Sequence, residues 1–140
     1  TDTAGNVSST LTLSSFSVFD GQMGGSMQGV ELSLSTVVTT VAGTGSSGSA
    51  NGTGTSASFN APEGITTDGT NLYVADTSNN LIRQIVISTG VVTTVAGTGS
   101  SGSANGTGTS ASFNLPHGIT TDGTNLYVAD MSNHLIRKIE

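Results

Sequence analysis

The chain has 140 residues and a formal net charge of −6; 34% of its residues are hydrophobic, 9% are charged and 20 are glycine. Its 3 cations stand against 9 acids. Nucleic acids and anionic membranes attract basic surfaces, so this balance argues against both partners. Cysteine is absent, which excludes disulfides, thiolate metal sites and cysteine nucleophiles. No apolar run reaches the roughly 18 residues that a membrane-spanning helix needs.

Residues 1–35 are unlike the rest of the chain, and we expect them to form a polar arm with short strands. In TLTLSSFSVF, residues 10–19, the apolar side chains change face midway, which predicts a bulged strand or two short strands. A glycine-rich break follows at 20–29, and VELSLS at 30–35 alternates like a half-buried strand. The apolar residues of the first segment are Leu11, Leu13, Phe16 and Val18.

From residue 36 onward the sequence repeats itself with a period of 54 residues. VVTTVAG at 37–43 returns at 91–97, so the two units are placed at 36–89 and 90–140. A period of roughly 40–55 residues built from several short strands is typical of a β-propeller blade. The clearest differences between the units are Ala61/Leu115, Glu63/His117, Thr77/Met131, Asn80/His134 and Gln84/Lys138.

Each unit is predicted to hold four strands, joined by short polar turns such as Asp68-Gly69. A glycine-rich loop at 43–63 has no regular period, and a loop of this length is usually functional or flexible. Phe59 and Pro62 are expected to pin its far end. The predicted strands are GITTD (64–68), NLYVAD (71–76), LIRQIVI (81–87) and VVTTVA (91–96), with their counterparts in the other unit.

These units resemble the NHL repeat. The resemblance rests on Phe59-x-x-Pro62-x-Gly64-Ile65, on the following Asp68 and on Asn71-Leu72-Tyr73-Val74-Ala75-Asp76, and the second unit contains the triplet Asn133-His134-Leu135. It covers about residues 37–140. It implies an all-β fold of four-stranded antiparallel blades, with GITTD lining a central channel and VVTTVA outermost. In this scheme residues 1–35 are a degenerate blade edge or a segment that links subunits.

Two blades do not close a ring, and an open stack would leave apolar faces bare. The second unit stops after its third strand, whereas VVTTVA at 37–42 is a fourth strand without a blade of its own. We therefore expect a homo-oligomer joined by strand exchange, as a closed trimer of six blades or as a filament, unless the chain belongs to a longer one. The expected assembly edges are Val37, Val38, Val41, Leu135, Ile136 and Ile139.

Two motifs carry candidate chemistry but have simpler interpretations. Gly43-x-Gly45-x-x-Gly48 matches a dinucleotide-binding pattern, but no helix-forming run follows it, which favours a flexible glycine loop. The aspartates that recur with the repeat are expected to cap hairpin turns. Calcium ligation near the channel is the alternative, although that ion needs about six to eight oxygens. These aspartates are Asp68, Asp76, Asp122 and Asp130.

The chain has only two histidines. His134 lies in the NHL triplet, where packing in a polar turn is the simpler expectation. His117 precedes the innermost strand, so a closed trimer would bring three copies of it towards one point, as in three-histidine zinc sites. It is the weak metal candidate; no catalytic residue and no cofactor are assigned.

The leading hypothesis is a non-enzymatic propeller scaffold on the outside of a bacterial cell or in its periplasm. Its partners would be further copies of itself and other surface proteins. One alternative is a ligand-binding sensor module from a larger NHL protein. A further alternative, with less support, is a metal-dependent enzyme that resembles NHL-type lyases or hydrolases.

Overall fold

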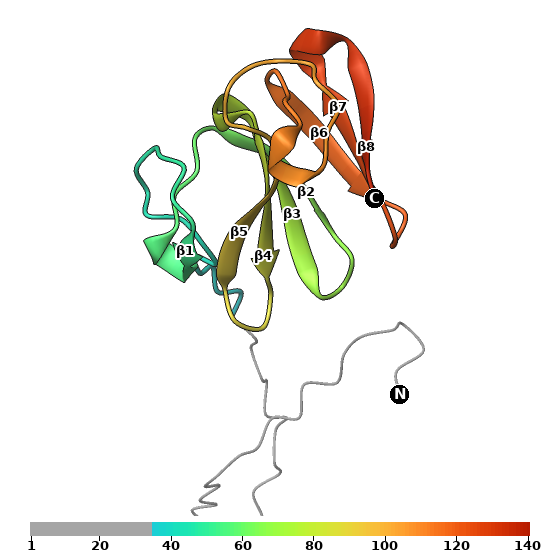
Figure 1. The fold of residues 1–140 in the computed structure, drawn as a ribbon. Coiled ribbons are helices and arrows are strands. Elements are labelled where there is room, and N and C mark those ends of the chain that lie inside the picture. The colour runs from blue at the N-terminus through green and yellow to red at the C-terminus, as the bar shows by residue number, and fades with distance from the viewer. Residues whose placement is uncertain (1–34) are drawn as a thin grey trace, which may run out of the picture. The chain divides into compact units, whose positions relative to one another are not determined.

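The structure is a computed structural model that describes residues 35–140. The strands predicted within residues 1–34, with Leu11, Leu13, Phe16 and Val18, lie outside the described residues. The regular elements of the described part are antiparallel strands and single 3-10 turns, joined by turns and by two longer irregular segments at 35–51 and 97–107 (Figure 1).

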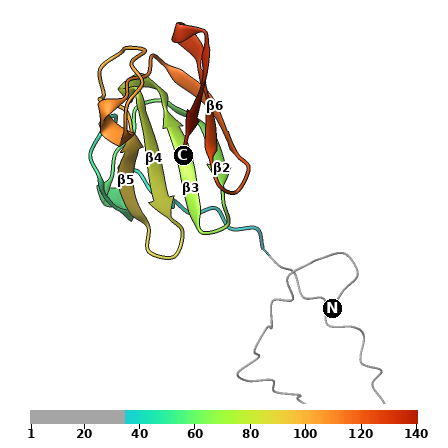
Figure 2. The ribbon, with the colours of Figure 1, turned by 45° about the vertical axis from the view of Figure 1, so that its right-hand side comes forward.

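Five strands form the first sheet, here called blade 1. Their order across the sheet is β1-β5-β4-β3-β2, and every neighbouring pair is antiparallel. Figure 2 shows β5, β4, β3 and β2 side by side in this order. The strands are β1 (Gly52–Thr53), β2 (Pro62–Thr67), β3 (Asn71–Asp76), β4 (Leu81–Val86) and β5 (Val91–Ala96). The four strands predicted at 64–68, 71–76, 81–87 and 91–96 are confirmed, and the short β1 adds a fifth outside them.

Three strands form the second sheet, here called blade 2. They are β6 (Pro116–Thr121), β7 (Leu126–Asp130) and β8 (Leu135–Ile139), in the order β6-β7-β8. The two blades have the same register after an offset of 54 residues, since Ile65 pairs with Val74 and Ile119 with Val128. Single 3-10 turns complete the elements: η1 (Gly54–Ser56), η2 (Thr77–Asn79), η3 (Gly108–Ser110) and η4 (Met131–Asn133).

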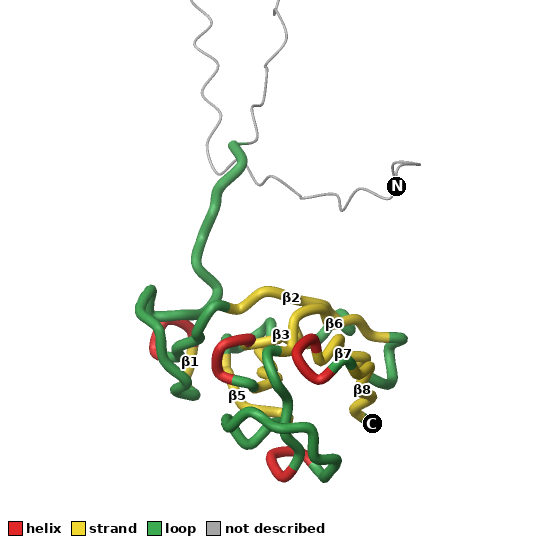
Figure 3. Tube along the Cα trace, turned by 90° about the horizontal axis from the view of Figure 1, so that it is seen from above, coloured by secondary structure: helices red, strands yellow, loops and turns green. Residues whose placement is uncertain are grey.

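The hydrophobic core is divided between the two faces of blade 1. Successive side chains of a strand point to opposite faces, so Ala75 on β3 faces blade 2 while its neighbour Val74 faces the other way. The face of blade 1 that is turned towards blade 2 forms the junction between the blades, where β2 and β6 lie next to each other (Figure 3). The junction cluster consists of Ala75, Ile82 and Ala96 from blade 1 with Phe113, Leu126 and Val128.

The opposite face of blade 1, turned away from blade 2, has a smaller cluster, with Ala57, Val74, Ile85 and Val92 buried and Phe59 half-buried. Burial of a valine or isoleucine side chain, as at Val74, Ile85 and Val92, contributes about 1.5–3 kcal/mol by removing apolar surface from water. Burial on both faces explains why the inner strands read as nearly continuous apolar runs.

Residues 37–42 form no strand in the structure, so the prediction of a strand at this position is wrong for the single chain. Val37 and Val38 are 75% and 92% exposed. The same six letters form β5 at Val91–Ala96, where β4 and β1 supply hydrogen-bond partners on both sides. The difference lies in the neighbours, because a strand holds its extended backbone through pairing with another strand.

Candidate functional site

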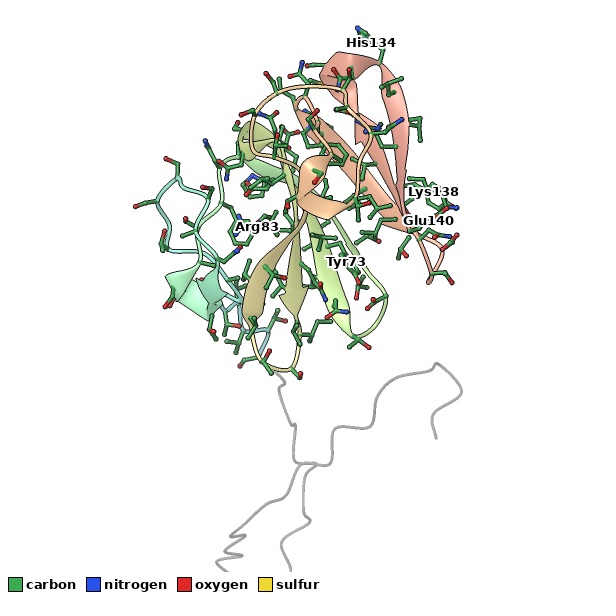
Figure 4. The ribbon with its side chains drawn as sticks, viewed as in Figure 1. Tyr73, Arg83, His134, Lys138 and Glu140 are labelled. Atoms are coloured by element: carbon green, nitrogen blue, oxygen red, sulfur yellow. The ribbon has the colours of Figure 1, made fainter. Side chains whose placement is uncertain are left out.

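A buried ion pair organises each repeat. In blade 1, Nη1 of Arg83 donates hydrogen bonds to Oδ2 of Asp76 at 2.8 Å and to the carbonyl of Ser58 at 3.0 Å. Its Nη2 donates to the carbonyl of Ala50 and to Oδ1 of Asn51, at 3.0 and 2.9 Å. Both charged side chains are fully buried. Figure 4 shows Arg83 between the strands of blade 1 and the loop that precedes them in the chain.

The second repeat builds the same arrangement. Arg137 donates to Asp130 at 2.9 Å and to the carbonyls of Ser112 and Ala104 at 2.9 and 3.0 Å. Arginine suits this position because its planar guanidinium presents several donors in a fixed fork. The prediction that Asp76 and Asp130 cap hairpin turns is therefore wrong. A carboxylate committed to arginine and to a backbone N–H is also a poor candidate for the calcium site considered above.

The glycine-rich loop has a defined structure, which the expectation of a flexible loop did not foresee. Its carbonyl groups are the acceptors of the buried arginine, and Ser47 forms a bridge with Phe59. The Phe59 ring lies under the Arg83 guanidinium, 5.0 Å from its centroid. This contact agrees with the prediction that Phe59 pins the far end of the loop. The loop is thus built around a cation of its own chain.

Asp68 behaves as the sequence predicted. Its Oδ1 accepts the backbone N–H of Asn71 at 2.7 Å and of Thr70 at 2.9 Å, and its Oδ2 accepts the hydroxyl of Tyr73 at 2.9 Å. The backbone donors of Asn71 and Thr70 lower the pKa of Asp68 from 3.8 to about 2. Asp122 makes the same turn in the second repeat, and the corresponding backbone donors lower its pKa too.

The two histidines lie apart. Nε2 of His117, on β6, is 2.8 Å from Oε2 of Glu63, on β2, and both side chains are about two-fifths exposed. His134 caps η4 with a left-handed φ of 56°, which matches the 55° of Asn80 in the first repeat, and it points outward from the tip of blade 2 (Figure 4). Within residues 35–140, no three His, Cys, Asp or Glu side chains are grouped closely enough to hold a metal. The three-histidine site needs three copies and stays a prediction.

The junction between the blades uses the residues at which the repeats differ. Oγ1 of Thr77 donates to the carbonyl of Pro116 at 2.7 Å. Oδ1 of Asn80 accepts the N–H of Leu115 at 2.8 Å, and the Glu63–His117 pair crosses the same boundary. Side chains from three of the differing pairs, Glu63/His117, Thr77/Met131 and Asn80/His134, therefore contribute to this junction. The differences between the repeats are concentrated where one blade meets the next.

Each end of the two-blade stack exposes a face that is buried at the junction. Ile136 on β8 is 77% exposed, whereas its counterpart Ile82 is 0% exposed. At the other end a groove of about 390 Å³ runs beside Val41, Phe59 and Val74. Of the predicted edge residues, Val37, Val38, Val41, Leu135 and Ile136 are exposed, whereas Ile139 is half-buried against the junction cluster.

Sequence reasoning missed Arg83 and Arg137 as the centre of each repeat. The signal was present, since these are 2 of the 3 cations in the chain and both stand inside apolar strands at the same place in the period. A charge inside a buried strand needs a partner, and Asp76 recurs in step with Arg83. This pairing could have been derived from the repeat itself.

Comparison with known proteins identifies the repeat. No protein-family model matches the chain. Over 98 residues the chain is 39% identical to NHL repeat-containing protein 2 of Bos taurus and 38% identical to its human counterpart. These matches cover 66% of this chain and 14% of the relatives, so the chain spans about one seventh of their length.

Solved structures show the same fold. An auxiliary nutrient binding protein from Bacteroides thetaiotaomicron matches with a TM-score of 0.64 and 31% identity, over 71% of this chain and 28% of that one. A candidate phosphatase from the same species matches with a TM-score of 0.63 and 26% identity, over 72% and 26%. The sequence matches, the strand order and the shared register lead to one conclusion: the chain belongs to the NHL-repeat β-propeller family.

Proposed function

We propose that this chain is a non-enzymatic propeller scaffold that acts through protein–protein contact, first of all with further copies of itself. The observation that carries the proposal is the pair of bare ends. One end exposes Ile136, the counterpart of fully buried Ile82, and the other exposes the groove beside Val41 and Val74. Faces of this kind are covered in closed propellers, and exposed apolar patches of this kind mark interaction sites.

The surface supports a location outside the cell or in the periplasm. It is rich in serine, threonine, asparagine and glycine and carries few charges, and the solved neighbours come from Bacteroides. Within residues 35–140, no helix has the length and apolar character needed to cross a bilayer. A surface or filament subunit fits these features, and other surface proteins would be its further partners.

The second candidate is a ligand-binding module of a larger NHL protein. It is favoured by the likeness to the nutrient binding protein and by the small share of the relatives that the chain spans. A metal-dependent enzyme has less support, because His117 already pairs with Glu63 across the junction. A sensor module would remain monomeric and bind a small molecule, whereas a scaffold would assemble.

Light scattering over a series of protein concentrations, combined with electron microscopy, tests the proposal. A scaffold gives masses that are multiples of the 13.8 kDa chain, seen as closed rings or as fibres. Ile136→Asp should weaken assembly, because it places a charge on the exposed face, whereas Ser88→Asp in an exposed turn is the matched control. A chain that stays monomeric at every concentration would contradict the scaffold.

A further inference from the structure

Blade 2 carries a groove along its outer strand. The groove has a volume of about 530 Å³ and lies between β8 and the segment around Gly106 and Thr107. Figure 4 shows Lys138 and Glu140 at the C-terminal end of β8, beside this groove. Its lining includes Ile136 to Ile139 of β8, the edge strand of blade 2, which no strand within residues 35–140 pairs with on that side.

Blade 1 shows what occupies the equivalent place. There β5 lies between β4 and β1, with Ile82 opposite Ala96 and Gln84 opposite Thr93. On its other side, Val92 lies opposite Gly52. The occupant of the slot in blade 1 is therefore VVTTVA, paired along both edges.

The six-residue segment VVTTVA occurs a second time in the chain, where it forms no strand. Residues 37–42 read VVTTVA, identical to 91–96, and within residues 35–140 they pair with no strand. The residue that follows each copy makes the same hydrogen bond. The N–H of Gly43 donates to the carbonyl of Gly54 at 3.1 Å, as the N–H of Gly97 donates to the carbonyl of Gly108 at 3.2 Å. The backbone just after the segment is thus already held as it is after β5.

We propose that residues 37–42 of a second copy of the chain insert into this groove as the fourth strand of blade 2. The proposal rests on the proposed function and specifies its contact. The 54-residue offset fixes the register, with Thr39 of one copy opposite Lys138 of the other, as Thr93 lies opposite Gln84. Pairing of an extended segment with an exposed sheet edge is a general mode of recognition, in which main-chain hydrogen bonds supply affinity.

The contact is head-to-tail, since the C-terminal blade of one copy receives the N-terminal segment of the next. The same step places the bare face around Ile136 against the groove beside Val41 and Phe59 of the second copy, as Ile82 lies against the Phe113 cluster at the internal junction. Repetition of such a heterologous contact gives a ring if it closes and a filament if it does not.

A pair of introduced cysteines tests the register, because the chain has no cysteine of its own. In Thr39→Cys/Lys138→Cys both positions are exposed, and residues directly opposite on antiparallel strands lie within reach of a disulfide. Mild oxidation should give a ladder of covalent dimers, trimers and larger species. The matched control is Thr93→Cys/Lys138→Cys, in which the first cysteine lies in the same six letters but is already paired within blade 1.

A ladder in the first variant and none in the control supports the proposal. Equal ladders in both variants, or a cross-linked monomer, would overturn it. If no ladder forms while light scattering still shows assembly of the unmodified chain, strand insertion is wrong and the scaffold stands. If no ladder forms and the unmodified chain is monomeric, both proposals fail.

Discussion

Arg83 holds the first repeat together, because its four hydrogen bonds join β4 to Asp76 and to three sites in the preceding loop. Removal of one member of a buried ion pair leaves an uncompensated charge and typically costs about 3–5 kcal/mol. Arg83→Met should lower the free energy of unfolding by about that amount, as measured by urea denaturation. Gln84→Ala, at the adjacent half-buried position, is the control and should cost about 1 kcal/mol or less. A loss below 1 kcal/mol for Arg83→Met would contradict this role.

Asp68 gives the repeat a defined dependence on pH. Its pKa in the folded chain is about 2 against an ordinary 3.8, so folding favours its charged form. The stabilisation is present above pH 4 and is lost as the pH falls through 2. Melting temperatures of the wild type and Asp68→Asn should therefore converge between pH 5 and pH 2. Subtracting one from the other removes the effect of the other carboxylates, and a constant difference would refute the assignment.

At the scale of the element, the junction between blades depends on Gly64. A Cβ at this position would collide with the carbonyl oxygen of His117 and lie 3.0 Å from the nitrogen of Ile119. At Gly118, its counterpart, the nearest atom is Cβ of Ala129 at 3.8 Å. In urea denaturation at low protein concentration, Gly64→Ala should cost about 1–3 kcal/mol, whereas Gly118→Ala should stay within about 0.5 kcal/mol. Equal effects would mean that the junction is not tightly packed.

The strands were predictable from the sequence because each carries its own signal. Apolar alternation, the Asp68-Gly69 turn and the 54-residue period located the strands β2 to β5 of blade 1. The six letters VVTTVA show the limit of such signals, since they form β5 at 91–96 and no strand at 37–42. Local preference is the same in both places, and the presence of neighbouring strands decides the outcome.

The candidate site was less predictable, because it depends on contacts between distant residues. The edge residues Val37, Val38 and Ile136 followed from counting strands, and the structure places them on exposed surfaces. Arg83 bonds to loop carbonyl groups that are 25 and 33 positions away in the sequence, and no local sequence pattern predicts such contacts. The role of the differing pairs likewise depends on contacts between distant residues, since Thr77 bonds to Pro116 and Asn80 to Leu115 across the junction.

At the scale of the whole molecule, the two blades form a stack with two exposed faces. The exposed face of blade 2 has the same residue positions as the face of blade 1 at the internal junction, and the exposed face of blade 1 has those of blade 2 at that junction. Thr77 and Asn80 bond across that junction, whereas Met131 and His134 hold the same places at the end. A junction between copies would therefore lack the threonine hydrogen bond and would place an imidazole where the asparagine amide lies. We expect this contact to be weaker than the internal one and to depend on protein concentration.

The mass of Gly118→Ala in solution tests the central claim most directly. The residue is unobstructed in the single chain, but in a head-to-tail stack its Cβ would meet Glu63 of the next copy, as a Cβ at Gly64 meets His117. Light scattering should show assembly of the wild type and a monomer for Gly118→Ala with an unchanged melting temperature at low concentration. If the variant assembles as readily as the wild type, the ends of the stack do not join in this way.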